Sequence, residues 1–264
     1  MARYTVKDIA KKYQAKEKLV AVAAYSKIMA ELADNHAEII LVGDSLGMVI
    51  YGLESTLPVN LDLMIKHGLA VVKNSSKAMI VIDMPFATYQ VTPELAFQNA
   101  AKIIQETGAN AVKLEGGVEL QDTISFLTKR GIAVLGHIGL MPQYVNQLGG
   151  YKIQGKDILS VEKIIADAIA VAEAGAFALV IEGVKAEVVQ AVKQKVNLPL
   201  IGIGAAKDCD GQILVAHDLL GLTAEVPKFV KKYKNLRQEI ANGFAEYKAE
   251  VKSGEFPSDE HTYK

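Results

Sequence analysis

The sequence has a single cysteine, no tryptophan and almost no net charge, at −1 for pH 7. One cysteine, Cys209, cannot form an intrachain disulfide, which suits a reducing compartment. Balanced charge provides no overall field that would attract nucleic acid or an anionic membrane. These absences exclude a disulfide scaffold and argue against a nucleic-acid partner.

Long apolar runs are missing as well. No run approaches the ~20 residues that span a bilayer. The polar start from Met1 to Asp8 lacks the apolar stretch of a signal peptide. We therefore expect a cytoplasmic protein with no membrane association. Half of the 264 residues (50%) are apolar, which is enough for a large buried core.

Short apolar runs rich in β-branched residues recur along the chain and do not alternate with polar residues. This pattern is typical of parallel strands buried on both faces. The predicted strands are Leu19–Ala24, Glu38–Gly43, Ala78–Asp83, Ala111–Glu115, Ala133–His137, Ala178–Glu182, Leu200–Gly204 and a short eighth one near Gly211–Ala216.

Helical patterns fill the gaps between these strands, and several end just before a glycine that can close a helix. The predicted helices are Ser26–Asn35, Leu61–Asn74, Pro93–Thr107, Leu120–Lys129, Val161–Ala174 and Lys185–Val196. Strand and helix in regular succession predict a (β/α)8 TIM barrel. A doubly wound open sheet is the alternative.

No linker rich in proline, glycine or serine divides the chain, so we expect a single barrel domain over residues 1–264. A charged helical pattern over Phe229–Lys252 predicts a C-terminal helix. The residues from Ser253 onward predict a short irregular tail.

Acidic residues stand at the ends of four predicted strands: Asp44, Asp83, Glu115 and Glu182. Burying unpaired charge is costly, so packing alone does not favour carboxylates there. In parallel α/β folds, ligands bind at the carboxyl ends of the strands. The pattern therefore predicts a hard-cation site with an acid/base group beside it.

Asp44 and Asp83 each have an ordinary interpretation as a capping or loop-starting residue, with Ser45 assisting Asp44. Two aspartates from different strands are less easily explained that way. Mg²⁺ prefers carboxylate oxygens and usually retains water. We therefore interpret the pair as metal ligands. Gly43 and Gly47 flank Asp44 and Ser45 and would let the backbone approach a ligand closely.

Lys113, Glu115 and His137 lie in the same region of the predicted sheet. Lys113 and Glu115 are two residues apart in one strand, so their side chains share a face. They can be interpreted as a structural salt bridge inside the barrel, or as groups that bind the substrate (Lys113) and the metal (Glu115). His137 stands between Gly136 and Ile138-Gly139, which favours a functional histidine over a core one. Glu182 is interpreted as a general base or as the partner of a buried cation.

Eight segments occur in an order that resembles the ketopantoate hydroxymethyltransferase family, over nearly the whole chain. They are Val42–Met48, Asp83–Phe86, Val112–Gly117, Gly136–Leu140, Gln147–Tyr151, Glu173–Phe177, Ile201–Ala205 and Ser253–Pro257. The resemblance implies a barrel of the phosphoenolpyruvate/pyruvate superfamily type. It also implies Mg²⁺ and homo-oligomers, typically decamers.

The reaction implied by the resemblance belongs to pantothenate biosynthesis, the route to coenzyme A. A hydroxymethyl group passes from 5,10-methylenetetrahydrofolate to 3-methyl-2-oxobutanoate and gives 2-dehydropantoate. By the same resemblance, Asp44 and Asp83 bind both the metal and the substrate. Glu115 belongs to the outer shell of the metal.

The resemblance also implies substrate contacts from Ser45, Lys113 and His137, and a catalytic base at Glu182. The chain departs from the common family pattern at Ser26, Gly183 and Ala206. None of these three positions carries an assigned role.

Two other functions remain to be tested against this one. A C–C lyase or mutase of the isocitrate lyase and phosphonopyruvate type would carry a reactive Lys-Lys-Cys-Gly loop, which the sequence lacks. A non-catalytic barrel that binds a small acid would not need the carboxylates, the lysine and the histidine together.

Overall fold

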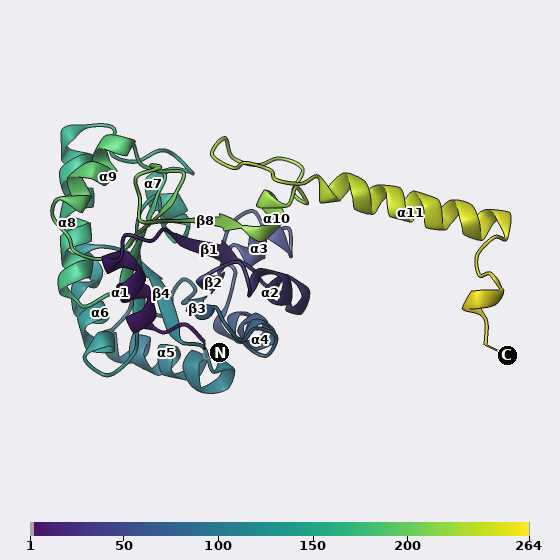
Figure 1. Ribbon diagram of the computed structural model, residues 1–264. Coiled ribbons are helices and arrows are strands. Elements are labelled where there is room, and N and C mark those ends of the chain that lie inside the picture. The colour runs from purple at the N-terminus through teal and green to yellow at the C-terminus, as the bar shows by residue number, and fades with distance from the viewer. Residues whose placement is uncertain (1–2, 264) are drawn as a thin grey trace. The chain divides into compact units, whose positions relative to one another are not determined.

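The computed structural model describes residues 3–263. Its eight strands are all parallel, each pairs with the next, and β8 pairs with β1 to close a barrel (Figure 1). The strands are β1 (Leu19–Ala23), β2 (Ile39–Val42), β3 (Met79–Asp83), β4 (Ala111–Glu115), β5 (Val134–Gly139), β6 (Ala178–Glu182), β7 (Leu200–Ile203) and β8 (Gly211–Val215). The predicted (β/α)8 barrel is confirmed.

One helix, α1, precedes the first strand, and the other helices of this unit follow strands, most of them around the outside of the barrel (Figure 1). They are α1 (Val6–Gln14), α2 (Lys27–Ala33), α3 (Leu46–Val49), α4 (Leu61–Val72), α5 (Pro93–Thr107), α6 (Gln121–Thr128), α7 (Val145–Leu148), α8 (Ile158–Glu173) and α9 (Ala186–Lys193). Every residue of β2, β3 and β4 is buried, as expected for strands enclosed between barrel interior and helices.

Local sequence explains where α5 begins and ends. The Thr92 side chain accepts a hydrogen bond from the Leu95 N–H, and Pro93 occupies the first helical turn, where its missing N–H costs nothing. Gly108 closes the helix in the left-handed conformation at φ 76°. The predicted span Pro93–Thr107 is therefore found without change.

The predicted strands Ala111–Glu115 and Ala178–Glu182 are also found without change, and the other predicted strands and helices are present with ends shifted by a few residues. Helix α1 was not predicted, although Thr5 and Asp8 form a reciprocal capping box at its start. That Thr-x-x-Asp spacing is the signal that could have revealed it.

The chain divides into two compact units, one through Val215 and the other from Ala216 onward. The second unit contains α10 (Ala216–Leu219), α11 (Leu236–Ser253) and the short 3₁₀ helix η3 (Asp259–His261). Within residues 3–263, no helix is both long and apolar enough to cross a membrane.

The C-terminal helix predicted over Phe229–Lys252 begins later, at Leu236, so its predicted start is wrong. The backbone N–H groups of Tyr233 and Leu236 donate to the carbonyls of Leu219 and Leu220, which holds this stretch outside a helix. The lysines that precede Leu236 also repel one another at helical spacing.

Candidate active site

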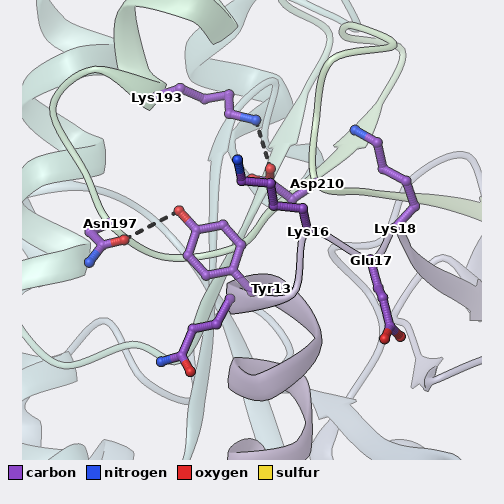
Figure 2. A pocket seen from close by; sticks show the side chains of 8 residues that line it. Tyr13, Lys16, Glu17, Lys18, Lys193, Asn197 and Asp210 are labelled. Atoms are coloured by element: carbon purple, nitrogen blue, oxygen red, sulfur yellow. Dashed lines mark hydrogen bonds and ion pairs between the residues drawn. The ribbon is translucent and has the colours of Figure 1, made fainter.

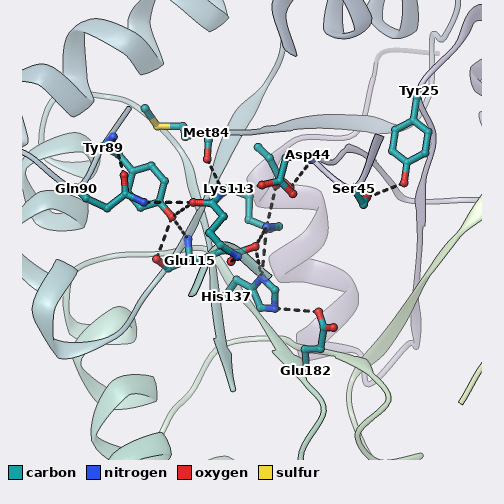
Figure 3. Close-up of polar contacts among 12 residues, drawn as sticks. Tyr25, Asp44, Ser45, Met84, Tyr89, Gln90, Lys113, Glu115, His137 and Glu182 are labelled. Carbon is teal, nitrogen blue, oxygen red and sulfur yellow. Dashed lines mark hydrogen bonds and ion pairs between the residues drawn. The ribbon is translucent and has the colours of Figure 1, made fainter. Parts of the chain in front are cut away.

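The predicted site residues gather at the carboxyl ends of β2 to β6. Strand register explains the neighbours: Asp83 of β3 is the partner of Lys113 on β4, and Glu115 of β4 is the partner of His137 on β5. Asp44 lies two residues after the end of β2 and, like these four, is buried. The structure thus brings together residues far apart in the sequence (Figure 3).

Lys113 links the carboxylates of the site. Its Nζ lies 2.9 Å from Asp83 Oδ1, 3.4 Å from Glu115 Oε1 and 3.4 Å from His137 Nδ1. The backbone N–H of Asp44 donates to Asp83 Oδ2 at 3.1 Å, which ties the two aspartates together. The ammonium partly offsets three carboxylates in one small volume.

His137 lies between two carboxylates. Its Nδ1 is 3.2 Å from Glu115 Oε1, and its Nε2 is 3.2 Å from Glu182 Oε2. Glu182 differs from the other carboxylates of the site because 15% of its side chain is exposed, against 3% for Asp83 and 1% for Glu115. Glu182 is therefore the carboxylate at the open edge of the cluster.

The aspartates carry an electrostatic cost. Burial raises the pKa of Asp44 well above its ordinary value, and the neighbouring charges of Asp83 and Glu115 raise it further. Burial likewise raises the pKa of Asp83. A proton or a bound cation would relieve this cost.

Glu115, Lys113 and His137 are kept charged by one another. Burial acts to raise the pKa of Glu115, but Lys113 and His137 outweigh it and lower the value to about 2. Burial acts to lower the pKa of Lys113, yet the surrounding carboxylates raise it. The pKa of His137, lowered by burial and by Lys113 but raised more by Glu115 and Glu182, reaches about 9.

The donor set fits a cation that needs few protein ligands. Asp83 Oδ1 is buried and has no well-directed hydrogen bond among the described residues, although Lys113 lies close to it. Within residues 3–263, no three acidic, histidine or cysteine side chains form a complete metal cage. Mg²⁺ does not need one, because it is commonly held by one or two carboxylates with water and substrate.

Ser45 is positioned by the first strand. The hydroxyl oxygens of Ser45 and Tyr25, which follows β1 closely, lie 2.7 Å apart. His67 Nδ1 is 2.6 Å from the Tyr25 carbonyl oxygen, so this histidine supports the loop. The family departure at Ser26 has a local explanation, since Ser26 caps α2 by accepting from the Met29 N–H.

Two further polar residues contact the cluster, and the sequence analysis missed both. Gln143 and Tyr89 are buried, and each reaches a carboxylate-bearing residue of the site. Glutamine and tyrosine in loops carry no distinctive spacing. The only available signal was their position shortly after strands that end in the site.

A cavity of about 550 Å³ lies elsewhere in the barrel unit (Figure 2). Its lining includes Lys18 and Asp210, which immediately precede β1 and β8, so it opens at the amino ends of the strands. Lys18 donates to the Cys209 carbonyl, and Lys193 pairs with Asp210 at 2.6 Å. These lysines are engaged with the protein, away from the carboxylate cluster.

Comparison with known proteins identifies the family. The ketopantoate hydroxymethyltransferase profile matches residues 3–259. This chain belongs to the ketopantoate hydroxymethyltransferase family. A 3-methyl-2-oxobutanoate hydroxymethyltransferase from Bordetella petrii is 53% identical over 93% of this chain and 90% of its own length. One from Rhodospirillum centenum is 53% identical over 99% of this chain and 95% of its own length.

Solved structures share the fold of this ketopantoate hydroxymethyltransferase family member. A phosphonopyruvate hydrolase, in complex with oxalate and Mg²⁺, has a TM-score of 0.62 at 14% identity, covering 98% of this chain and 93% of its own. A 2,3-dimethylmalate lyase of the PEP mutase/isocitrate lyase superfamily has a TM-score of 0.58 at 14% identity, covering 98% and 92%. The predicted family, barrel fold and hydroxymethyltransferase activity are confirmed.

Proposed function

We propose that the chain transfers a hydroxymethyl group from 5,10-methylenetetrahydrofolate to 3-methyl-2-oxobutanoate with Mg²⁺ and forms 2-dehydropantoate for pantothenate biosynthesis. The observation that carries this proposal is the full-length family match, joined to a buried carboxylate cluster at the functional end of the barrel. A related fold that holds oxalate and Mg²⁺ is consistent with a 2-oxo acid beside a metal.

Asp44 and Asp83 are the proposed metal ligands, and Glu115 would act from the outer shell. When bound, Mg²⁺ would supply Lewis-acid stabilisation of negative charge on the substrate's keto oxygen. Lys113 would balance the negative charge that the substrate carboxylate adds. Ser45, held by the Tyr25 hydroxyl, would offer a hydrogen bond to the same substrate.

Glu182 is the proposed base. It lies at the open edge of the cluster, where a substrate can reach it, and His137 Nε2 lies 3.2 Å from its carboxylate. Glu182 would take the proton from C3 of 3-methyl-2-oxobutanoate, leaving an enolate. His137 would orient Glu182 and contact the substrate.

The enolate carbon would then form the new C–C bond with the one-carbon unit of the folate. Both bonds from the one-carbon unit to the folate nitrogens break, these nitrogens take up the proton removed from C3 and one proton of water, and tetrahydrofolate is released. One water is consumed, and its oxygen becomes the new hydroxyl group.

The test measures loss of methylenetetrahydrofolate with 3-methyl-2-oxobutanoate, with and without Mg²⁺. Asp44→Ala and Asp83→Ala should each abolish turnover while circular dichroism shows an intact fold, since each removes an oxygen ligand of one cation. Asp62→Ala, on the exposed face of α4, should react like wild type. Normal turnover in either site variant at ordinary Mg²⁺ concentration would reject the metal assignment.

Two broader predictions stay proposals of the same kind. The homo-oligomer, typically a decamer in this family, is a proposal about assembly. The cytoplasmic location is proposed from the single cysteine, which suits a reducing compartment.

A further inference from the structure

Gln143 connects the two sides of the carboxylate cluster. It lies in the 3₁₀ helix η2 (Pro142–Tyr144) that follows β5, and its side chain is buried. The amide Nε2 donates to Asp44 Oδ2 at 2.8 Å and to the Met84 carbonyl at 2.9 Å. The backbone N–H of Gln143 donates to Glu115 Oε2 at 2.9 Å. One residue therefore holds two carboxylates that originate on different strands.

Tyr89 determines which way the Gln143 amide points (Figure 3 shows Tyr89 beside Gln90 and Glu115). The Tyr89 hydroxyl accepts from the Glu115 N–H at 3.1 Å, and of its two acceptors Gln143 Oε1 at 2.6 Å is closer than the Glu115 carbonyl oxygen at 3.1 Å, so we assign its one hydrogen to Gln143. Gln90 Nε2 also donates to Gln143 Oε1, at 3.2 Å. A reversed amide would point its oxygen at the Asp44 carboxylate and its NH₂ at these donors. Only the observed orientation satisfies every group.

We propose that Gln143, oriented by Tyr89, is a positioning residue that fixes the carboxylates of Asp44 and Glu115 for the cation. This inference rests on the proposed metal role of Asp44. A neutral amide suits the task, because it orients a carboxylate through one oxygen without adding a positive charge that competes with the metal. An oxygen that accepts one hydrogen bond also keeps a second lone pair.

The experiment measures Mn²⁺ binding to the folded, substrate-free protein by the electron paramagnetic resonance signal of free Mn²⁺. Gln143→Met keeps the length of the side chain and removes both amide contacts. Its Kd for Mn²⁺ should rise by about 10- to 100-fold, as is typical when a group that orients a metal ligand is lost. Tyr89→Phe removes the hydroxyl that orients the amide and that accepts from the Glu115 N–H, and its Kd should rise in the same direction.

Turnover provides a second readout. Since the ligands remain in Gln143→Met, the Mg²⁺ concentration at half-maximal rate should rise, while kcat at saturating Mg²⁺ recovers. A general disturbance of the fold would instead lower the turnover rate at every Mg²⁺ concentration, including saturation.

Two matched control variants remove a glutamine amide and a tyrosine hydroxyl at positions away from the carboxylate cluster. Gln105→Met changes an exposed glutamine of α5, and Tyr13→Phe removes a hydroxyl that donates to Asn197 in the cavity of Figure 2. Both should bind Mn²⁺ like wild type.

Wild-type affinity in Gln143→Met overturns the inference and leaves the metal site standing. If Gln143→Met fails to fold, Tyr89→Phe decides, and wild-type affinity there overturns it as well. Undiminished Mn²⁺ binding in Asp44→Ala would instead overturn the proposed metal site, and this inference with it.

Discussion

Glu182 and His137 are the two candidates for the base, and contact geometry separates them. Both ring nitrogens of His137 already face carboxylates, at 3.2 Å each, whereas Glu182 lies at the open edge of the cluster. Glu182 can accept a proton while its Oε2 still faces His137 Nε2, because a carboxylate has a second oxygen. The structure therefore favours Glu182 as the group that meets the substrate's C3 hydrogen.

We predict that Glu182→Gln still binds Mg²⁺ and 3-methyl-2-oxobutanoate but barely exchanges the C3 proton with solvent deuterium. Glutamine keeps the volume of the side chain and cannot accept the proton, and a general base typically contributes ~10²–10⁴-fold in rate. Proton exchange followed by NMR measures this. Near wild-type exchange in Glu182→Gln, together with its loss in His137→Asn, would make His137 the base.

Asp34 stabilises the barrel from outside the site. Its buried carboxylate accepts hydrogen bonds from the backbone N–H groups of Ser76, Lys77 and Ala78, just before β3. Burial acts to raise the pKa of Asp34, but these donors outweigh it and lower the value. The carboxylate therefore stabilises the folded state above its unfolded pKa, and this contribution is lost as the pH falls through the lower, folded pKa.

We predict that Asp34→Asn lowers the free energy of unfolding by about 2–3 kcal/mol near neutral pH, because an amide cannot accept all of these bonds. The gap to wild type should begin to narrow as the pH drops below about 4, where the Asp34 carboxylate of the unfolded chain takes up a proton, and should close through the lower pKa of the folded state. Urea unfolding at a series of pH values measures this, with the exposed Asp62→Asn as control. A gap that is constant over pH would contradict it.

At the residue scale, sequence reasoning found the charged groups and Ser45 and missed two neutral residues, Gln143 and Tyr89. Asp44, Asp83, Glu115 and Glu182 were recognisable because charge at the end of a buried strand needs an explanation. Gln143 was not, because an amide in a loop gives no such signal. Its role depends on a contact across 99 positions of the chain, which only the closed barrel creates.

At the element scale, the strands were predicted well because a strand buried on both faces leaves an unbroken apolar run. Short or polar elements were predicted less well. The four-residue helices α3 and α7 are too brief to show a period. The start of α11 depends on backbone bonds to Leu219 and Leu220, which the local sequence does not reveal.

The pairing of β5 with β6 requires a glycine at position 139, opposite Glu182. Gly139 adopts φ 89°, and a Cβ there would lie 2.4 Å from the Glu182 carbonyl oxygen. Gly131 adopts a similar φ of 87°, but a Cβ there would meet nothing within 4 Å. Alanine substitutions at the two glycines therefore separate the stability cost of backbone strain from the cost of a steric clash.

We predict that Gly131→Ala costs about 1 kcal/mol of stability through backbone strain alone. Gly139→Ala should cost clearly more and should also reduce turnover, since the clash displaces the strand end that carries Glu182. Thermal unfolding and the folate assay measure the two effects. Equal losses in both variants would show that β6 accommodates the extra methyl group.

At the scale of the whole molecule, one face of α11 is apolar and exposed. Ile240, Phe244, Tyr247 and Val251 recur at spacings of four, three and four residues, which places them on one side of the helix, and all are exposed in the single chain. An aligned set of large apolar side chains is characteristic of a surface that another protein covers. This supports the proposed homo-oligomer and suggests where copies meet.

We predict that sedimentation at micromolar concentration gives a mass several times the 28.5 kDa of one chain. Phe244→Glu should lower that mass, because a buried interface penalises an unpaired charge. Asn242→Glu places the same charge on the opposite side of α11, so it should leave the assembly intact. A wild-type monomer would refute the oligomer. Equal masses for wild type and Phe244→Glu would contradict an interface at α11. They would show that the charge at position 244 is not buried between copies.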